Sequence, residues 1–154
     1  TLNGGTGSDI LDGGNDGDTL NGGGEEDVLY GRNGNDRLDG AEGNDTLYGG
    51  NDSDTFVLSS TGAANIDTIA DFNVAQDTIE LRNSIFGLGS SGAINADAFF
   101  VGATAGDAED RIIYDPATGV LYYDADGNGA GAAVQIATLN AGLALTNADF
   151  VGGP

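Results

Sequence analysis

Apolar residues recur at every ninth position through the first third of the chain. Six nine-residue units follow one another without a gap over residues 4–57, and each begins with Gly. The eighth residue of each unit is Leu, or Phe in the last unit: Leu11, Leu20, Leu29, Leu38, Leu47 and Phe56. The sixth residue is always Asp: Asp9, Asp18, Asp27, Asp36, Asp45 and Asp54. An unbroken period of this kind indicates a repeat architecture.

Each unit divides into a turn and a short strand. Positions one to six are mainly Gly, Asn, Asp and Ser, which tolerate positive φ and form turns. Positions seven to nine, such as residues 10–12 and 19–21, alternate in polarity and are too short to persist as isolated strands. Two units therefore predict one coil of turn, strand, turn and strand, in which the Leu side chains stack inside and each unit lies below the unit two places later.

This stacking brings the Asp side chains together in pairs. Neighbouring parallel strands lie about 4.8 Å apart, and the pairs are Asp9/Asp27, Asp18/Asp36, Asp27/Asp45 and Asp36/Asp54. At that distance two carboxylates repel each other by roughly 1 to 4 kcal/mol. One Leu per nine residues does not offset both this repulsion and the entropy of ordering the chain. We therefore expect folding of the repeats to require a divalent cation between each pair.

Composition narrows the choice of cation and excludes several functions. The chain has no Cys and no His, which removes disulfides, thiolate sites, most zinc and copper sites, and the usual catalytic base. The remaining oxygen ligands suit calcium first and magnesium second. With 25 acidic residues against 4 Arg, the formal charge of −21 would repel nucleic acid and anionic lipid. No apolar run reaches the roughly 18 residues of a membrane span. Catalysis within the chain is not expected.

The units resemble the RTX repeat (repeats in toxin, the haemolysin-type calcium-binding repeat), G-G-x-G-x-D-x-U-x. The resemblance covers residues 1–57 and implies an all-β fold, a calcium-bound parallel β-roll that is a right-handed solenoid, with about four or more calcium ions. In that family one turn supplies the carbonyls of positions two and four and its Asp, and the turn two units later supplies the carbonyls of positions one and three and its Asp.

Four calcium sites follow when this pattern is carried onto the chain. Site one is Gly5, Gly7 and Asp9 with Gly22, Gly24 and Asp27. Site two is Gly14, Asp16 and Asp18 with Gly31, Asn33 and Asp36. Site three is Gly23, Glu25 and Asp27 with Gly40, Glu42 and Asp45. Site four is Arg32, Gly34 and Asp36 with Gly49, Asn51 and Asp54.

The repeats depart from the motif at five positions where it has Gly: Asp16, Glu25, Arg32, Ala41 and Asp52. Asp accepts left-handed geometry fairly well, whereas Glu25 and Arg32 do so poorly. Sites three and four are therefore expected to be the weaker ones. The alternative, that the glycines serve only as turn residues, leaves the Asp at every sixth position without a reason.

Beyond Val57 the period stops, and residues 66–72 and 77–81 alternate as strands do. Their run D-T-I-x-D-F…D-T-I-x-L resembles the segment that follows the repeats in many RTX proteins. We expect it to continue the roll and close its end, because a bare sheet edge invites pairing with other chains. Three acids there are candidates for a further calcium site, with solvated edge charge as the alternative: Asp67, Asp71 and Asp77.

Three more strands are predicted at residues 111–114, 120–123 and 133–137, the first two joined as a hairpin by the turn sequence D-P-A-T-G. The following loop begins like an EF-hand, with oxygen ligands at its first, third and fifth places: Asp124, Asp126 and Asn128. Its twelfth place is Gln135 instead of Glu, and strands flank it. A Gly-rich hairpin loop without a metal is the alternative.

The resemblance implies a roll at residues 1–58 and a β-rich cap with an export-signal region at 59–154. Its expected function is to fold on exposure to extracellular calcium and so support type I secretion, by the type I secretion machinery, and the stability of a larger secreted protein. Residues 149–151 resemble the end of such a signal, from which residues 152–154 depart. Without an initial Met or signal peptide, and starting within a repeat, the chain is expected to be a fragment.

Two other functions remain open. One is an adhesive or surface-layer module that binds glycan or another copy of itself, for which exposed tyrosines are candidates: Tyr114, Tyr122 and Tyr123. The other is an accessory domain of an upstream secreted hydrolase or epimerase.

Overall fold

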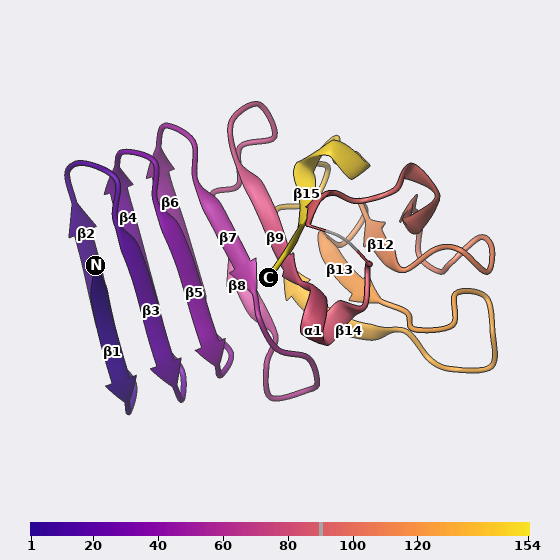
Figure 1. Cartoon of the computed structure of the whole chain (residues 1–154), viewed down its shortest axis with the longest axis horizontal. Coiled ribbons are helices and arrows are strands. Elements are labelled where there is room, and N and C mark those ends of the chain that lie inside the picture. Colours follow the sequence, from indigo (N-terminus) through magenta and orange to yellow (C-terminus); the bar gives the residue numbers. More distant parts are fainter. Residues whose placement is uncertain (90) are drawn as a thin grey trace.

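The computed structural model describes residues 1–89 and 91–154, and its regular elements are nearly all β-strands in two sheets (Figure 1). The first sheet, in spatial order, is β1 (Leu2–Thr6), β3 (Thr19–Gly24), β5 (Arg37–Glu42), β7 (Thr55–Leu58), β9 (Thr78–Arg82), β15 (Phe150–Gly153) and β10 (Gly92–Ala93). The second is β11 (Phe99–Val101), β12 (Ile112–Asp115), β13 (Val120–Tyr123), β14 (Val134–Thr138), β8 (Asp67–Ile69), β6 (Thr46–Asn51), β4 (Val28–Asn33) and β2 (Ile10–Gly14). Three short helices are α1 (Asn83–Phe86), η1 (Ala96–Ala98) and η2 (Asn147–Asp149).

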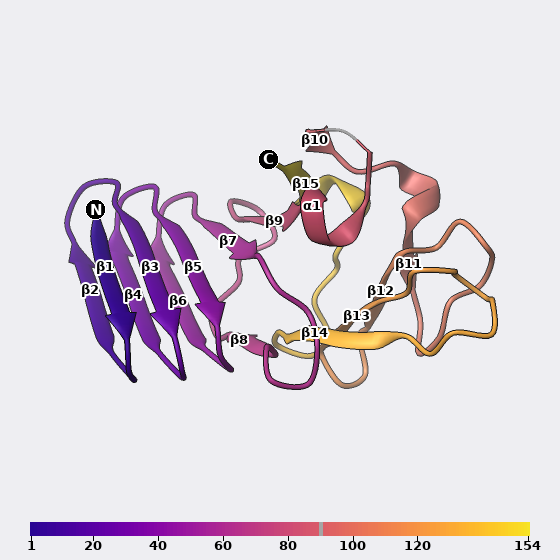
Figure 2. The same cartoon turned by 60° about the horizontal axis from the view of Figure 1, so that its bottom comes forward.

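Strands of the repeats pair in parallel with the strand two units later. Leu20 pairs with Leu38 between β3 and β5, and Leu29 pairs with Leu47 between β4 and β6. This register of 18 residues is twice the nine-residue period, so each coil contains two units. Figure 2 shows the two sheets facing each other, joined by the turns at both edges. The predicted parallel β-roll is thereby confirmed.

The inward side chains of the roll form one continuous column. Five of the six repeat positions are completely buried, whereas Leu11 at the open end keeps 6% of its surface exposed. The column joins the core of the second half, which includes Ile79, Tyr114 and Phe150. The apolar interior therefore runs without a break from the repeats into the following residues.

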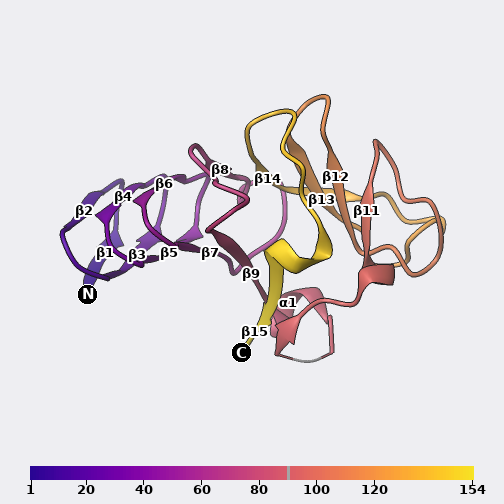
Figure 3. The same cartoon turned by 90° about the horizontal axis from the view of Figure 1, so that it is seen from above.

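Both sheets continue past the last repeat, as Figure 3 shows from above. β9 pairs in parallel with β7 and carries β15, while β8 pairs in parallel with β6 and carries β14. The hairpin predicted at residues 115–119 is present, with β12 and β13 antiparallel. Closure of the roll by the second half is thus achieved by strands that extend each sheet in turn.

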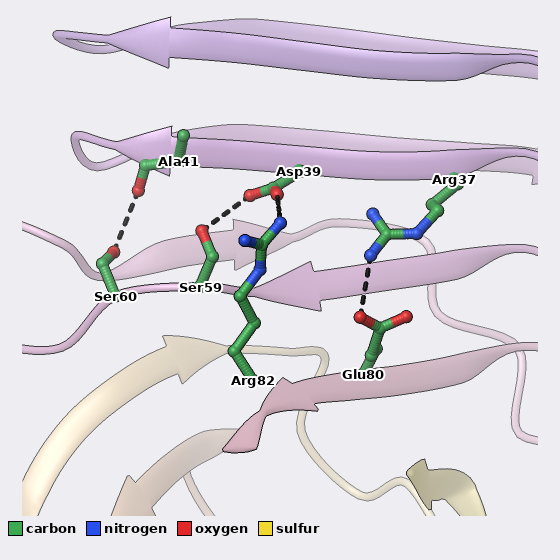
Figure 4. Close-up of polar contacts among 7 residues, drawn as sticks. All are labelled: Arg37, Asp39, Ala41, Ser59, Ser60, Glu80 and Arg82. Carbon is green, nitrogen blue, oxygen red and sulfur yellow. Dashed lines mark hydrogen bonds and ion pairs between the residues drawn. The ribbon is translucent and has the colours of Figure 1, made fainter. Parts of the chain in front are cut away.

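Two ion pairs bridge β5 and β9 across the strand between them (Figure 4). The Arg37 guanidinium lies 2.7 Å from the Glu80 carboxylate, and that of Arg82 lies 2.9 Å from the Asp39 carboxylate. Val57 of β7 is in register with Asp39 and Glu80 and is completely buried. These pairs, here called the clamp, join the fourth repeat to the strands beyond the array.

Loss of Arg82 should destabilise the fold, because it leaves Asp39 buried with only the Ser59 hydroxyl as side-chain partner. We expect Arg82→Met to lower the free energy of unfolding in calcium by about 1–3 kcal/mol, less than for a fully buried pair because Arg82 is partly exposed. Arg32→Met is the matched control, since the Arg32–Asp12 pair is half exposed on both sides and should contribute less than about 1 kcal/mol. Urea unfolding measures both, and equal losses would contradict a role for the clamp.

Candidate metal sites

The turns of the roll repeat one backbone conformation. Positions two and four have positive φ in all six units, and five of these residues are not Gly: Asp16, Glu25, Arg32, Ala41 and Asp52. Their φ values run from 69° to 83°, the left-handed region that costs an L-residue about 1–2 kcal/mol. Arg32 has compensating contacts, because its guanidinium bonds the Asp12 carboxylate and lies 4.7 Å from the Tyr30 ring centroid.

This conformation aims backbone carbonyls at the next coil. A Cβ added to Gly34 would come within 2.7 Å of the Asp16 carbonyl oxygen, one coil below. The same approach occurs once in each of the other three predicted sites, where the oxygens of Gly5, Glu25 and Arg32 face Gly23, Gly43 and Gly50. At least one carbonyl from position two or four therefore points into the gap between coils in every predicted site.

Carbonyls and carboxylates from adjacent coils face the same point above the first Gly of a unit. A Cβ on Gly4 would lie 2.7 Å from Asp9 Oδ2 and 2.5 Å from the Gly22 carbonyl oxygen. On Gly31 it would lie 2.5 Å from Asp36 Oδ2 and 2.6 Å from the Gly49 carbonyl oxygen. Position one is Gly because any side chain would fill the space toward which these oxygens converge.

The Asp side chains form a ladder that satisfies only half of each carboxylate. The Oδ1 atom accepts the backbone N–H of the Asp one coil below, at 2.7 Å for Asp9 to Asp27 and 2.9 Å for Asp36 to Asp54. The Oδ2 atom is buried without a hydrogen-bond partner in the described part of the chain at five positions: Asp9, Asp27, Asp36, Asp45 and Asp54. A buried unpaired carboxylate oxygen is costly. Calcium, which takes six to eight oxygens, fits this donor set.

The predicted ligands are not equally enclosed. Asp18 of site two is only half-buried near the open end and also bonds the N-terminal amine at 3.2 Å. At position three, Asn33 donates to Asn15 and accepts from Asn51 through side-chain amides at 2.9 and 2.8 Å. This ladder was not predicted, although Asn at 18-residue spacing signals it. The carbonyls of the four position-three residues remain predicted ligands: Gly24, Asn33, Glu42 and Asn51.

Carboxylates alone do not complete any site. Over residues 1–89 and 91–154, no three acidic side chains gather closely enough to hold a metal. Each predicted repeat site has two carboxylates, so backbone carbonyls must provide the other ligands. In the same residues no helix is long and apolar enough to cross a membrane.

The EF-hand-like loop is held by its own backbone. Asp124 is buried and its Oδ1 accepts the Asp126 N–H at 3.2 Å, while Asp126 Oδ2 accepts the Gly131 N–H at 3.0 Å. These backbone donors, foremost Gly131, lower the pKa of the exposed Asp126. Asn128 and Asp124 line a cavity of about 480 Å³. Calcium binding at Asp124, Asp126 and Asn128 stays a prediction.

The three tyrosines proposed as an exposed glycan surface have different positions. Tyr114 is completely buried and its hydroxyl donates to the Asn140 carbonyl at 2.9 Å, so its predicted exposure is wrong. The Tyr123 hydroxyl donates to the Phe86 carbonyl at 3.0 Å. Tyr122 lines the 480 Å³ cavity beside Asp124 and is the tyrosine of the three that borders an open space.

Burial raises the pKa values of the stacked carboxyls. The pKa of Asp54 rises to about 6 and that of Asp67 to about 8, first through burial and further through neighbouring carboxylates. Burial also raises the pKa of three more: Asp36, Asp45 and Asp77. Backbone N–H donors oppose these shifts in each case. Without a cation, the stack therefore favours protons on its carboxyls.

Comparison with known proteins agrees with this geometry. The model of the RTX calcium-binding nonapeptide repeat matches residues 1–29 and 21–56. Among 21 matching chains of solved structure is the AlgE6R3 subunit of the Azotobacter vinelandii mannuronan C5-epimerase, with a TM-score of 0.54 and 28% identity. That match covers 95% of this chain and 80% of the subunit. No curated protein matches the chain in sequence.

Residues 1–56 therefore belong to the RTX calcium-binding nonapeptide repeat family. The chain is a β-roll protein whose repeats are calcium-binding, and its RTX segment is structural in kind, not catalytic.

The raised pKa values predict how the metal-free protein responds to pH. The pKa values of Asp54 and Asp67 are higher in the folded chain than their ordinary value of 3.8. The free energy of unfolding of the metal-free chain is therefore highest near pH 3.8 and falls as pH rises through about 6 and 8. Far-UV circular dichroism in chelator should therefore show more β-structure at pH 5, where these carboxyls can be protonated, than at pH 8. More β-structure at pH 8 than at pH 5 would contradict the stacking of buried carboxyls.

The inner carboxylates should matter more than the outer ones. Asp27 and Asp36 each face a coil above and a coil below, so replacing either with Ala should remove about two calcium equivalents, as expected of a one-dimensional stack. Asp9→Ala should remove about one and fray only the open end. Calorimetric calcium titration compares the three variants. If Asp9→Ala proves as damaging as Asp27→Ala, successive coils do not share ligands.

Proposed function

We propose that this chain is a calcium-dependent folding module of a larger secreted protein, unfolded at low calcium and folded at extracellular calcium. The observation that carries the proposal is the stack of buried Asp Oδ2 atoms, without hydrogen-bond partners in the described chain, that face carbonyls of the adjacent coil. Bound calcium supplies positive charge to these oxygens. The chain's own residues supply the coil, the turn conformation and the carboxylate spacing.

The free energy that calcium binding is expected to add to the folded state is large enough for calcium to control folding. If each site has a Kd of about 10⁻⁴ M, as extracellular calcium modules often do, calcium at about ten times that concentration stabilises the fold by about 1.4 kcal/mol per site. About four sites then contribute roughly 5–6 kcal/mol, which is comparable with the whole stability of a small domain. At sub-micromolar calcium the contribution is close to zero.

A folding switch also suits type I export. The segment that resembles an export signal contains Phe150, which is completely buried, on β15 between β9 and β10. Secretion machinery could therefore contact the Phe150 side chain only while the chain is unfolded. Low calcium inside the cell would keep it readable, and calcium outside would bury it. Export by the type I machinery and an extracellular location are parts of this proposal.

A second candidate is an accessory module of a secreted polysaccharide-modifying enzyme. The likeness to a mannuronan C5-epimerase subunit over 95% of the chain favours it. Such a module folds on calcium in the same way and contributes binding, not catalysis. Retention of the calcium-loaded chain on polymannuronate, lost in chelator, separates this candidate from a module that serves only folding and export.

Calcium should convert the chain from coil to β-structure. Far-UV circular dichroism is expected to change from coil-like to β-rich as calcium rises, and chelator should reverse it. Magnesium is the control, because it requires octahedral geometry at about 2.0–2.1 Å and gives up water reluctantly, so it should fold the chain poorly. Identical spectra with and without calcium, or equal midpoints for the two ions, would overturn the proposal.

A further inference from the structure

The Asp ladder does not stop where the repeats stop. The backbone N–H of Asp45 donates to Asp67 Oδ1 at 3.1 Å, and that of Asp54 donates to Asp77 Oδ1 at 3.0 Å. These two acids lie 22 and 23 residues further on, instead of 18, yet they continue the bond that joins the repeat carboxylates. Both are buried, with exposures of 4% and 7%, so solvated edge charge is the wrong interpretation for them.

Two unpaired oxygens lie at the junction between the last coil of repeats, which contains the fifth and sixth units, and the strands β8 and β9 that follow it. In the repeats, the unpaired Oδ2 of an Asp faces the gap to the coil above, where it meets a carbonyl of that coil. The Oδ2 atoms of Asp45 and Asp54 are likewise buried and lack a hydrogen-bond partner in residues 1–89 and 91–154, and each carboxylate is 1% exposed. Each lies against the first Gly of its own unit, Gly40 and Gly49, as the lower ones do. Asp45 and Asp54 are the upper carboxylates of repeat sites three and four, and no further repeat unit follows above them.

The turns below the junction have the conformation found at the repeat sites. In the fifth unit Ala41 and Gly43 have φ of 72° and 140°, and in the sixth Gly50 and Asp52 have φ of 101° and 80°. Since this conformation turns the carbonyls of positions two and four toward the next coil higher in the roll, the same backbone oxygens point toward the strands beyond the last coil of repeats. A buried unpaired carboxylate oxygen and the left-handed turn conformation are thus repeated once more in each stack.

The acid at the top of one stack shows where the stack ends. Unlike the repeat carboxylates, Asp77 has both oxygens bonded, because its Oδ2 accepts the Asn73 N–H at 2.8 Å. Asp71 covers the same end, accepting from Gly49 N–H at 2.9 Å and Gly50 N–H at 3.1 Å. Asp54 is therefore the last Asp of this stack with a carboxylate oxygen that is unpaired in the described chain, and at Asp77 both oxygens are hydrogen-bonded.

The ladder bonds join the Asp residues into two stacks, one ending in Asp45 and Asp67 and the other in Asp54 and Asp77. We propose that each of these stacks holds one more calcium ion than the repeats provide, between Asp45 and Asp67 in one and between Asp54 and Asp77 in the other. This inference rests on the proposed function, because it uses the same ion and ligand types. The two sites differ in their surroundings. Above the fifth unit Ser60 donates to the Ala41 carbonyl and Asn65 accepts the Gly43 N–H, whereas above the sixth unit the Asp71 carboxylate accepts the Gly49 N–H.

Calcium counted by native mass spectrometry tests the proposal. Asp67→Asn and Asp77→Asn keep an oxygen that accepts the ladder N–H, and each should lose about one ion relative to the unaltered chain, with about two lost in the double variant. Asp110→Asn is the matched control, a buried acid whose Oδ2 accepts from Gly106 and Asp107 backbone N–H groups away from the stacks, and it should lose none. Unchanged counts in both junction variants would overturn the proposal.

A second measurement covers the case in which a junction variant does not fold at saturating calcium. The count is then taken on Asp126→Ala, which disables the exposed loop site and leaves the stacks intact. About six ions support the two junction sites, and about four overturn them while the proposed function stands. A chain that binds no calcium at all removes the proposed function as well.

Discussion

Repulsion between stacked carboxylates is the constraint on which this structure depends. The nine-residue period places an Asp from each coil directly above that of the previous coil, and the ladder bond from one backbone N–H to the next Oδ1 fixes this spacing. The second oxygen of each inner carboxylate is then enclosed without a partner in the described chain. The apolar column inside the roll and the charged column at its turns are products of the same repeat, so the first cannot form while the second is uncompensated.

Much of the repeat region could be predicted from the sequence because its rule is local and repeated. Asp at position six, Leu at position eight and Gly at position one determined the coil, the carboxylate pairs and the two-unit register. Glu25 and Arg32 were expected to fit the left-handed turns poorly, yet they adopt them. Neighbouring units provide enough pairing to enforce this geometry, and Arg32 regains contacts with Asp12 and Tyr30.

The second half was less predictable because its decisive contacts have no period. The strands and the hairpin were recognisable from alternation, but the clamp joins Arg37 to Glu80 and Asp39 to Arg82, both 43 residues apart. Tyr114 looked like a surface aromatic and is instead at the centre of the core. Such pairings depend on how the chain folds back after β9, which alternation within single strands does not encode.

The two-unit coil has a consequence for how such proteins vary in length. Consecutive units lie on opposite sheets, so each nine-residue insertion or deletion in the first three units turns everything ahead of it by about half a revolution relative to the end closed by β8 and β9. The clamp fixes the fourth unit to that end, which leaves the earlier units free to change in number. An odd change reverses the side that a preceding segment faces, and an even change restores it while lengthening the roll by about 4.8 Å per coil. Whether the number of repeats is odd or even thus determines which side a preceding segment faces, independently of how many ions the repeats bind.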